Sequence, residues 1–432
     1  MKNEGTTGLK KNTNKENCVR MKSFTDYSQQ MQRYHIQSTP DPYRPVKEYF
    51  QCQVSNMGSE MLPMLNGWYV HEGESLTTYP NGVIVGSLKA ALQLYPELVK
   101  PFLNAQEDDA DPLMASNAQQ FTDGVFLYIP DNVKVEKPFQ IVSLVNSRED
   151  LLVQNRNLIR VGQNSEVSVI QCDDSTRYGK TFINVVTEIQ LAEHAHLHYY
   201  KTENKEADSL LFHHLYVNQQ AYSLFHSNAI TFNAGYVCNN IHINLNEPFA
   251  EANLYGLYLV DKNQHCDNRI RVVHHAPDCK SRQLYKGIMD DEAQAGFLGH
   301  VVVKPDAQRT VALQTNRNIL LTDKAKINTK PFLEIYADDV QCSHGATVGQ
   351  LDDEALFYLR SRGIALRTAR KLLMFAFANE VVQFVEIQAL RDRLSDMVQR
   401  RLNGELTICD QCLLHNAEHS DMIFPIDPEK IK

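Results

Sequence analysis

Cys342 and His344 are the side chains best suited to chemistry with iron. They stand two residues apart in a stretch that lacks helical periodicity. Side chains two apart on a strand point to the same face, and a thiolate and an imidazole on one face are both good iron ligands. The alternative is a buried histidine packed beside a buried thiol.

A second group of metal-ligating residue types lies further upstream. His265-Cys266, His274-His275 and Cys279 fall within 15 residues of one another. We take Cys266, His274 and Cys279 as candidate metal ligands. No paired C-x-x-C spacing accompanies them, so the pattern is not specific for a metal site, and surface or strand positions are the alternative.

Three alternating histidines, His194, His196 and His198, share one face if this segment is a strand. Three imidazoles bind zinc or iron when a fourth ligand approaches. A solvated strand face is the competing interpretation.

The tail carries Cys409, Cys412, His415 and His419. C-x-x-C is half of a common zinc site, but the spacing from Cys412 to His415 is too short for an ordinary finger loop. A metal role for this tail is an open alternative.

Several catalytic motifs are missing from the sequence. There is no Gly-x-x-x-x-Gly-Lys-Ser/Thr phosphate loop, so any ATP hydrolysis must come from a partner. Neither the Gly-x-Gly-x-x-Gly turn nor the Gly-x-Ser-x-Gly elbow occurs. The acidic pairs at 173–174, 290–291 and 338–339 are adjacent, and neighbours on a strand face opposite ways. A carbohydrate-active enzyme, which needs two carboxylates in one groove, is therefore a minor alternative.

Composition excludes some classes of partner. The 432 residues carry a net charge of −9, which argues against general nucleic-acid binding. We find no signal peptide and no apolar run of roughly 20 residues, so we expect a cytoplasmic protein without membrane contact. The nine cysteines are an odd number, and most are expected to be reduced. Met21 is an alternative start, since residues 1–21 are expected to be disordered.

The elements that position these residues fall into three blocks. Residues 22–123 predict an N-terminal helical domain, with Pro96 splitting one helical stretch into two short helices. Residues 124–349 alternate in short β-rich runs, with small residues before them (Ala195, Ala252 and Ala293, for example). Recurrent small residues at corners favour a β-solenoid over a jelly roll, because hairpin turns such as Asn-Gly are missing.

Residues 350–404 predict a C-terminal helical domain of three helices, ending at Gly404, before a mobile tail over residues 405–432. Leu390, Leu394, Met397 and Leu402 make one apolar stripe on the last helix. Such a stripe is usually core packing. Docking of a partner is the alternative.

A long motif resembles the SufB/SufD family. Residues 328–364 read NTKPFLEIYADDVQCSHGATVGQLDDEALFYLRSRGI, which is similar to the signature of that family. Shorter matches occur at 117–130, 273–274, 279–288, 307–308 and 316–321. The resemblance covers roughly residues 110–402 and excludes the tail.

The resemblance implies a right-handed parallel β-helix flanked by two helical domains. It also implies a subunit that pairs with a SufB-like paralogue through the β-helix and docks a SufC-like ATPase through its C-terminal helices. Such complexes assemble nascent iron–sulfur clusters, and some are associated with a reduced flavin. A stand-alone metal-delivery protein is the alternative function.

Within this family the chain resembles the SufD branch. SufB chains carry a glutamate where this chain has Gly345, and their acceptor cysteine aligns near Arg317. The resemblance implies that His344 and Cys342 face that cysteine across the subunit interface. Leu390, Leu394 and Met397 are the residues expected to dock the ATPase.

Overall fold

A computed structural model describes residues 24–40, 58–71, 73–103, 111–175, 180–204, 208–233 and 235–404. The expectations for residues 1–21 and for the tail from residue 405 lie outside these ranges. No helix in the described ranges is both long enough and apolar enough to cross a membrane.

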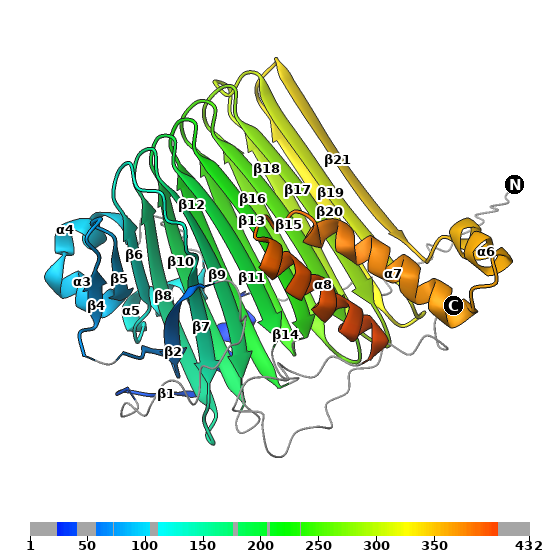
Figure 1. Cartoon of the computed structure of the whole chain (residues 1–432), viewed down its shortest axis with the longest axis horizontal. Helices are drawn as coiled ribbons and strands as arrows, with labels where there is room; N and C mark the ends of the chain where they lie inside the picture. Colours follow the sequence, from blue (N-terminus) through cyan, green and yellow to red (C-terminus); the bar gives the residue numbers. More distant parts are fainter. Residues whose placement is uncertain are drawn as a thin grey trace, which may run out of the picture.

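The central part of the chain is a parallel β-helix made of two facing sheets (Figure 1). Successive strands alternate between the sheets, so each coil contributes one strand to each. The first sheet contains β6 (Val125–Ile129), β8 (Leu151–Val161), β10 (Thr181–Leu191), β12 (Ser209–Gln219), β14 (Tyr236–Leu245), β16 (His265–His274), β18 (Gln294–Val303) and β20 (Lys326–Ile335). The second contains β7 (Phe139–Val145), β9 (Glu166–Ser175), β11 (His196–Asn204), β13 (Leu224–Asn233), β15 (Glu251–Val260), β17 (Lys280–Met289), β19 (Thr310–Leu320) and β21 (Val340–Gly349).

The corners explain why the repeat is hard to see in the sequence. Most coils turn at a residue with left-handed backbone conformation, including Asn164, His194, Tyr222 and Phe249. These residue types differ from coil to coil, although Asn tolerates this conformation best. His194, Tyr222 and Phe249 stack in a ladder with ring centroids 4.7 Å apart. The buried alanines lie beside such corners, as Ala195 does. The predicted β-solenoid is confirmed.

Alternation along each strand divides the side chains between the interior and an outer face. On β11, Leu197 and Tyr199 are buried in the core between the sheets, and His198 faces outward. On β19, Gln314 and Asn316 are buried while Arg317 is exposed. Every position therefore has a fixed direction, set by its register.

The N-terminal region contains strands as well as helices. The helices are α1 (Phe24–Met31), α3 (Leu88–Leu94), α4 (Pro96–Val99), the 3-10 turn η1 (Lys100–Phe102) and α5 (Pro112–Gln120). The strands are β1 (His35–Ile36), β2 (Glu60–Leu65), β3 (Trp68–Tyr69), β4 (Leu76–Thr78) and β5 (Ile84–Ser87). The split at Pro96 is confirmed, since proline opens α4. The strands are too short to leave an alternating pattern, so the sequence did not predict them.

Three C-terminal helices follow the β-helix: α6 (Asp353–Ser361), α7 (Leu366–Val382) and α8 (Gln388–Asn403). Asp352 caps α6 by accepting from two backbone amides, and Gly404 ends α8 with φ 76°. Figure 1 shows α7 and α8 lying side by side across the second sheet. Their apolar side chains form one buried cluster with outward-facing residues of that sheet.

Polar contacts fix this helical pair to the sheet. The buried Arg401 guanidinium lies 3.1 Å from the buried Asp261 carboxylate and also donates to the Phe232 carbonyl at 3.0 Å. Lys286 is paired with Glu380 on α7. Breaking one side of a buried pair such as Arg401–Asp261 is costly, which keeps the helices in one position.

Candidate functional site

The last strand of the β-helix, β21, lies at an open end. It pairs with β19 on one side, and in the described chain no strand pairs with its other side. Almost every residue of β21 is exposed. Exposed strand edges present unpaired backbone groups that can add a further strand.

Cys342 and His344 continue two interior columns of the β-helix at this end. Cys342 is the register partner of the buried Ala312, and His344 is the partner of the buried Gln314. Because parallel register partners face the same way, both side chains point toward the interior side, but no coil among the described residues covers them. The sequence-based expectation that they share a strand face agrees with this register.

The two side chains differ in exposure. Cys342 is partly buried against Ala312 and its neighbours, and burial raises the pKa of its thiol. His344 is exposed. The pair therefore presents an accessible imidazole beside a thiol that burial keeps protonated until a cation or base displaces the proton.

Gly345 and Arg317, the two positions by which the sequence resembles the SufD branch, also lie near this end. A side chain added at Gly345 would meet nothing within 4 Å, so packing does not require glycine there. Arg317 is on the outer face of β19 and pairs loosely with Glu380 at 3.9 Å. Neither position supplies a metal ligand.

Cys266, Cys279 and His274 are buried at separate polar contacts. The Cys266 thiol accepts from Asn268 at 3.5 Å, and burial raises its pKa well above the usual range. The Cys279 thiol donates to the Glu247 carbonyl at 3.2 Å, and burial raises its pKa to about 11. His274 is hydrogen-bonded to Ser281 at 2.9 Å, and burial lowers its pKa to about 3. Within the described chain, none of the three belongs to a cluster of three metal-ligating side chains. Their metal role stays a prediction.

The matches to known families decide the identity. The description "SUF system FeS cluster assembly, SufBD core domain" matches residues 143–377, and "SufBD protein N-terminal region" matches residues 5–141. The chain belongs to the SufBD family. The resemblance drawn from residues 328–364 is thereby confirmed. The family functions in iron–sulfur cluster assembly.

Relatives of this SufBD chain come from several bacteria. An iron–sulfur cluster assembly SufBD family protein of Synechocystis is 31% identical over 79% of the chain and 77% of its own length. The iron–sulfur cluster assembly protein SufD of Escherichia coli is 34% identical over 58% of the chain and 59% of its own length. SufD of Bacillus subtilis is 27% identical over 74% of both.

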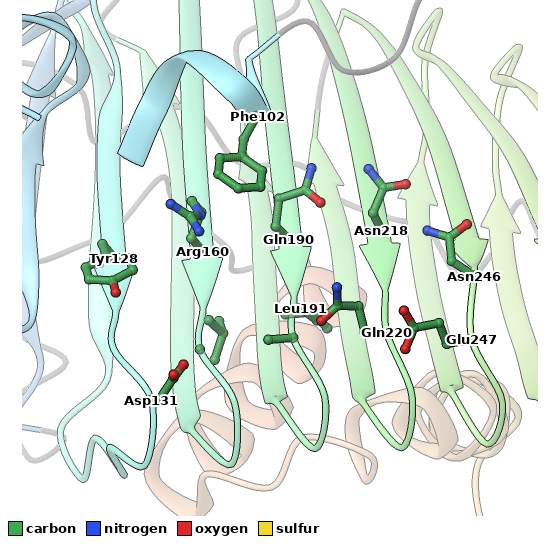
Figure 2. Close-up of a pocket in the computed structure, with 13 residues that line it drawn as sticks. Phe102, Tyr128, Asp131, Arg160, Gln190, Leu191, Asn218, Gln220, Asn246 and Glu247 are labelled. Atoms are coloured by element: carbon green, nitrogen blue, oxygen red, sulfur yellow. The ribbon is translucent and has the colours of Figure 1, made fainter. Parts of the chain in front are cut away.

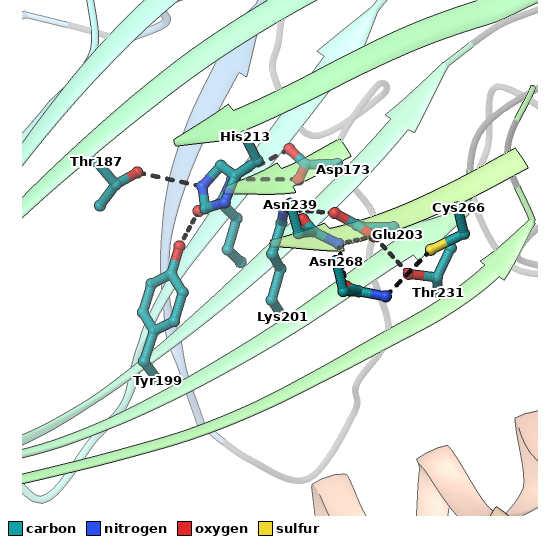
Figure 3. A network of polar contacts seen from close by, with 11 residues as sticks. Asp173, Thr187, Tyr199, Lys201, Glu203, His213, Thr231, Asn239, Cys266 and Asn268 are labelled. Carbon is teal, nitrogen blue, oxygen red and sulfur yellow. Dashed lines mark hydrogen bonds and ion pairs between the residues drawn. The ribbon is translucent and has the colours of Figure 1, made fainter. Parts of the chain in front are cut away.

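The interior of this SufBD β-helix holds a buried polar network that the sequence did not reveal (Figure 3). Lys201 is paired with Glu203, and both are buried. Glu203 also accepts from Thr231 at 2.6 Å and from Asn239 at 3.3 Å, and Lys201 donates to Asn239 at 3.1 Å. These residues come from two neighbouring strands of the second sheet, β11 and β13, and from β14 of the first sheet. The hydrogen bonds and the ion pair among these residues fix the register of the middle coils.

The apolar stripe of α8 points into the protein. Leu390 and Leu394 are buried, and Met397 is partly buried, all against the second sheet. The core-packing alternative accounts for their contacts. On the three C-terminal helices of this SufBD chain, the exposed large apolar and aromatic side chains lie instead on α6 and α7: Phe357, Tyr358, Leu366 and Leu372.

A groove of about 330 Å³ lies on the outer face of the first sheet, near η1 (Figure 2). Its one guanidinium, from Arg160, stacks 3.7 Å from the Phe102 ring and donates to the Leu98 carbonyl at 2.9 Å. Amide side chains from successive coils continue the wall: Gln190, Asn218 and Asn246. No cysteine or histidine lines it, so the groove is separate from the candidate iron ligands.

Proposed function

We propose that this chain is a SufD-type scaffold subunit of a cytoplasmic complex that assembles iron–sulfur clusters. It pairs with a SufB-like paralogue through the open end of the β-helix and docks a SufC-like ATPase through its C-terminal helices. The chain itself is non-catalytic. Membership of the SufBD family supports this proposal, together with the uncovered strand β21.

The open end supports pairing with a second β-helix. β20 and β21 end their sheets, and apolar side chains stay exposed there: Phe332, Ile335, Tyr336 and Val348. A patch of this kind on a strand edge is typical of an interaction surface. A partner strand beside β21 would cover these side chains and satisfy its backbone groups.

His344 is the residue that we propose acts on the nascent cluster. Its imidazole is accessible at the end of an interior column, where a partner's thiolate would face it. Neutral imidazole binds iron. Cys342 supplies a neighbouring thiol two residues away. Iron and sulfide are cargo passing through this interface.

The ATPase docks, in this proposal, through the exposed surface of α6 and the start of α7. Phe357 is 75% exposed and Tyr358 is 57% exposed, which is unusual for large aromatic side chains on a helix. Leu390, Leu394 and Met397 contribute indirectly, by holding α8 and α7 on the sheet.

Reconstitution of clusters on the purified three-protein complex tests the role of His344. We expect His344→Ala to leave the fold and the complex intact while cluster assembly falls strongly. Ser343→Ala is the matched control, because Ser343 is exposed on the same strand but points the opposite way. Normal assembly with His344→Ala would contradict the proposal, as would an equal loss with Ser343→Ala.

Co-purification tests the two docking surfaces separately. Phe357→Ser should weaken ATPase binding and leave pairing with the SufB-like chain unchanged. Leu94→Ser, which alters an apolar residue on α3 that is 65% exposed, should affect neither partner. A chain that binds neither partner before any substitution would favour the stand-alone metal-delivery alternative.

A further inference from the structure

Two histidines from adjacent coils meet a glutamate from the C-terminal helices. His198 on β11 and His226 on β13 are direct register partners, so both imidazoles lie on the outer face of the second sheet. Glu386 lies in the segment between α7 and α8, which covers this part of the sheet. The site therefore joins the β-helix to the helical pair.

The three side chains have the geometry of metal ligands. The His198 Nδ1 atom lies 3.4 Å from one Glu386 carboxylate oxygen, and the His226 Nδ1 atom lies 3.9 Å from the other. One ligand atom from each residue falls within 4.8 Å of the others. Bonds of about 2.0 Å in a tetrahedral zinc site place ligand atoms about 3.3 Å apart. A small adjustment of the exposed Glu386 side chain is enough to reach that spacing.

The hydrogen bond of His226 leaves a nitrogen lone pair directed at the carboxylate. His226 Nε2 lies 2.7 Å from the Phe384 carbonyl, which can only accept, so Nε2 carries the proton. In the neutral ring, Nδ1 is then an acceptor facing the carboxylate of Glu386. The buried Nδ1 atom of His198 has no hydrogen-bond partner. A nitrogen acceptor and a carboxylate that face each other favour a cation between them.

Burial keeps the imidazoles of His198 and His226 neutral and largely shielded from water. Burial lowers the pKa of His198, and burial together with His198 lowers the pKa of His226. The aromatic rings of Tyr255 and Phe384 stack 3.9 Å apart beside His226. A backbone carbonyl that orients a histidine through its second nitrogen is a recurring feature of metal sites.

We propose that His198, His226 and Glu386 bind one divalent transition-metal ion, of the borderline class that includes Zn²⁺ and Fe²⁺. Two imidazoles and one carboxylate are typical of these ions and unlike the all-oxygen sites of Mg²⁺ and Ca²⁺. The open coordination positions take water through the solvent-exposed side of Glu386. The bound ion ties two coils to the helical pair and stabilises their contact.

Titration of the full-length apoprotein with Co²⁺, followed by visible absorption, tests the site. The tail residues Cys409, Cys412, His415 and His419 also have ligand types, so a parent with all four replaced by serine or alanine removes their contribution. We expect one equivalent of Co²⁺ to bind this parent with ligand-field bands, and Zn²⁺ to displace it. Glu386→Gln should weaken binding by at least about tenfold, and His226→Asn should abolish it.

The matched control is Glu334→Gln. Glu334 lies 3.1 Å from His300, but that pair has only one imidazole. The control should bind Co²⁺ as the parent does. Because Glu386 is exposed, its substitution is not expected to disturb folding, and the circular dichroism spectrum checks this. Equal affinity in Glu386→Gln and the parent would overturn the proposal, as would no binding by the parent, which would indicate a proton between these groups.

Discussion

The middle of the β-helix and its C-terminal end are built from the same repeating strands, but inward-facing polar side chains are buried in the middle and uncovered at the end. In the middle, the interior charges of Lys201 and Glu203 are buried and bonded to each other and to neighbouring coils. At the end, Cys342 and His344 occupy equivalent inward-facing positions, and the part of the chain that the structure describes places no further coil above them. The helices α7 and α8 cover the middle of the second sheet, whereas β20 is partly exposed and β21 is almost wholly exposed.

This difference indicates that the inner coils of the β-helix provide its stability, whereas the terminal coil is available for binding. Each strand of an inner coil forms backbone hydrogen bonds with strands of the two neighbouring coils. The terminal coil has one neighbour only, so its polar groups and strand edges are available to a partner. Substitutions in the middle should therefore affect folding, while substitutions at the end should affect association.

The largest expected effect comes from breaking the buried ion pair. Lys201→Met leaves the Glu203 carboxylate buried without its cation, and we expect the free energy of unfolding to fall by about 3–5 kcal/mol. Denaturant titration of the isolated chain measures this. Replacing both Lys201 and Glu203 by methionine should recover most of the loss. A single variant within about 1 kcal/mol of the parent would contradict the comparison.

A matched pair of leucines compares the two regions directly. Leu257 on β15 is 1% exposed beneath the helices, and Leu313 on β19 is 36% exposed near the end. We expect Leu257→Ala to cost about 2–5 kcal/mol of unfolding free energy because it opens a cavity. Leu313→Ala should cost less than about 1 kcal/mol. Equal losses in denaturant titrations would show that coverage by α7 and α8 does not distinguish these positions.

Acid should destabilise the buried region through His274. Its folded-state pKa is about 3, below the ordinary value of 6.5. Below pH 6.5 this histidine binds a proton in the unfolded chain but not in the folded chain. The free energy of unfolding therefore falls as the pH drops from 6.5 toward 3. The contribution approaches about 1.4 kcal/mol per pH unit.

Urea titrations at several pH values check this prediction. His274→Gln should flatten the loss of stability below pH 6.5. Ser281→Ala, which alters the hydrogen-bond partner without removing a titrating group, should change the stability but keep the slope. Parallel slopes for His274→Gln and the parent would rule out the assignment.

The smallest effect is expected at the open end. Val348 is 46% exposed on β21, and Val348→Ser should change the free energy of unfolding of the isolated chain by no more than about 0.5 kcal/mol. The same variant should weaken pairing with the SufB-like partner, measured by co-purification. A stability loss above about 2 kcal/mol would mean that this end is already covered within the chain.

The sequence by itself determined the type of fold and the family. The alternating runs over residues 124–349 predicted strands, and the motif over residues 328–364 indicated the SufBD family. Two residues apart on a strand must face the same way, so the shared face of Cys342 and His344 was also predictable. The helix end at Gly404 followed from the freedom of glycine to take a positive φ.

Tertiary structure alone decided which of these residues meet. The alternation of His194, His196 and His198 suggested a shared face, but the backbone turns at His194, and only His198 meets His226 and Glu386. His226 lies one coil after His198 along the chain, and Glu386 lies after the end of the β-helix, between α7 and α8. No local spacing in the sequence could therefore reveal these two ligands. Likewise, the stripe at Leu390 and Leu394 identifies an apolar helix face, but only packing shows that it faces the chain's own sheet. Periodicity fixes the direction of a side chain relative to its own element, whereas its partner depends on how distant elements stack.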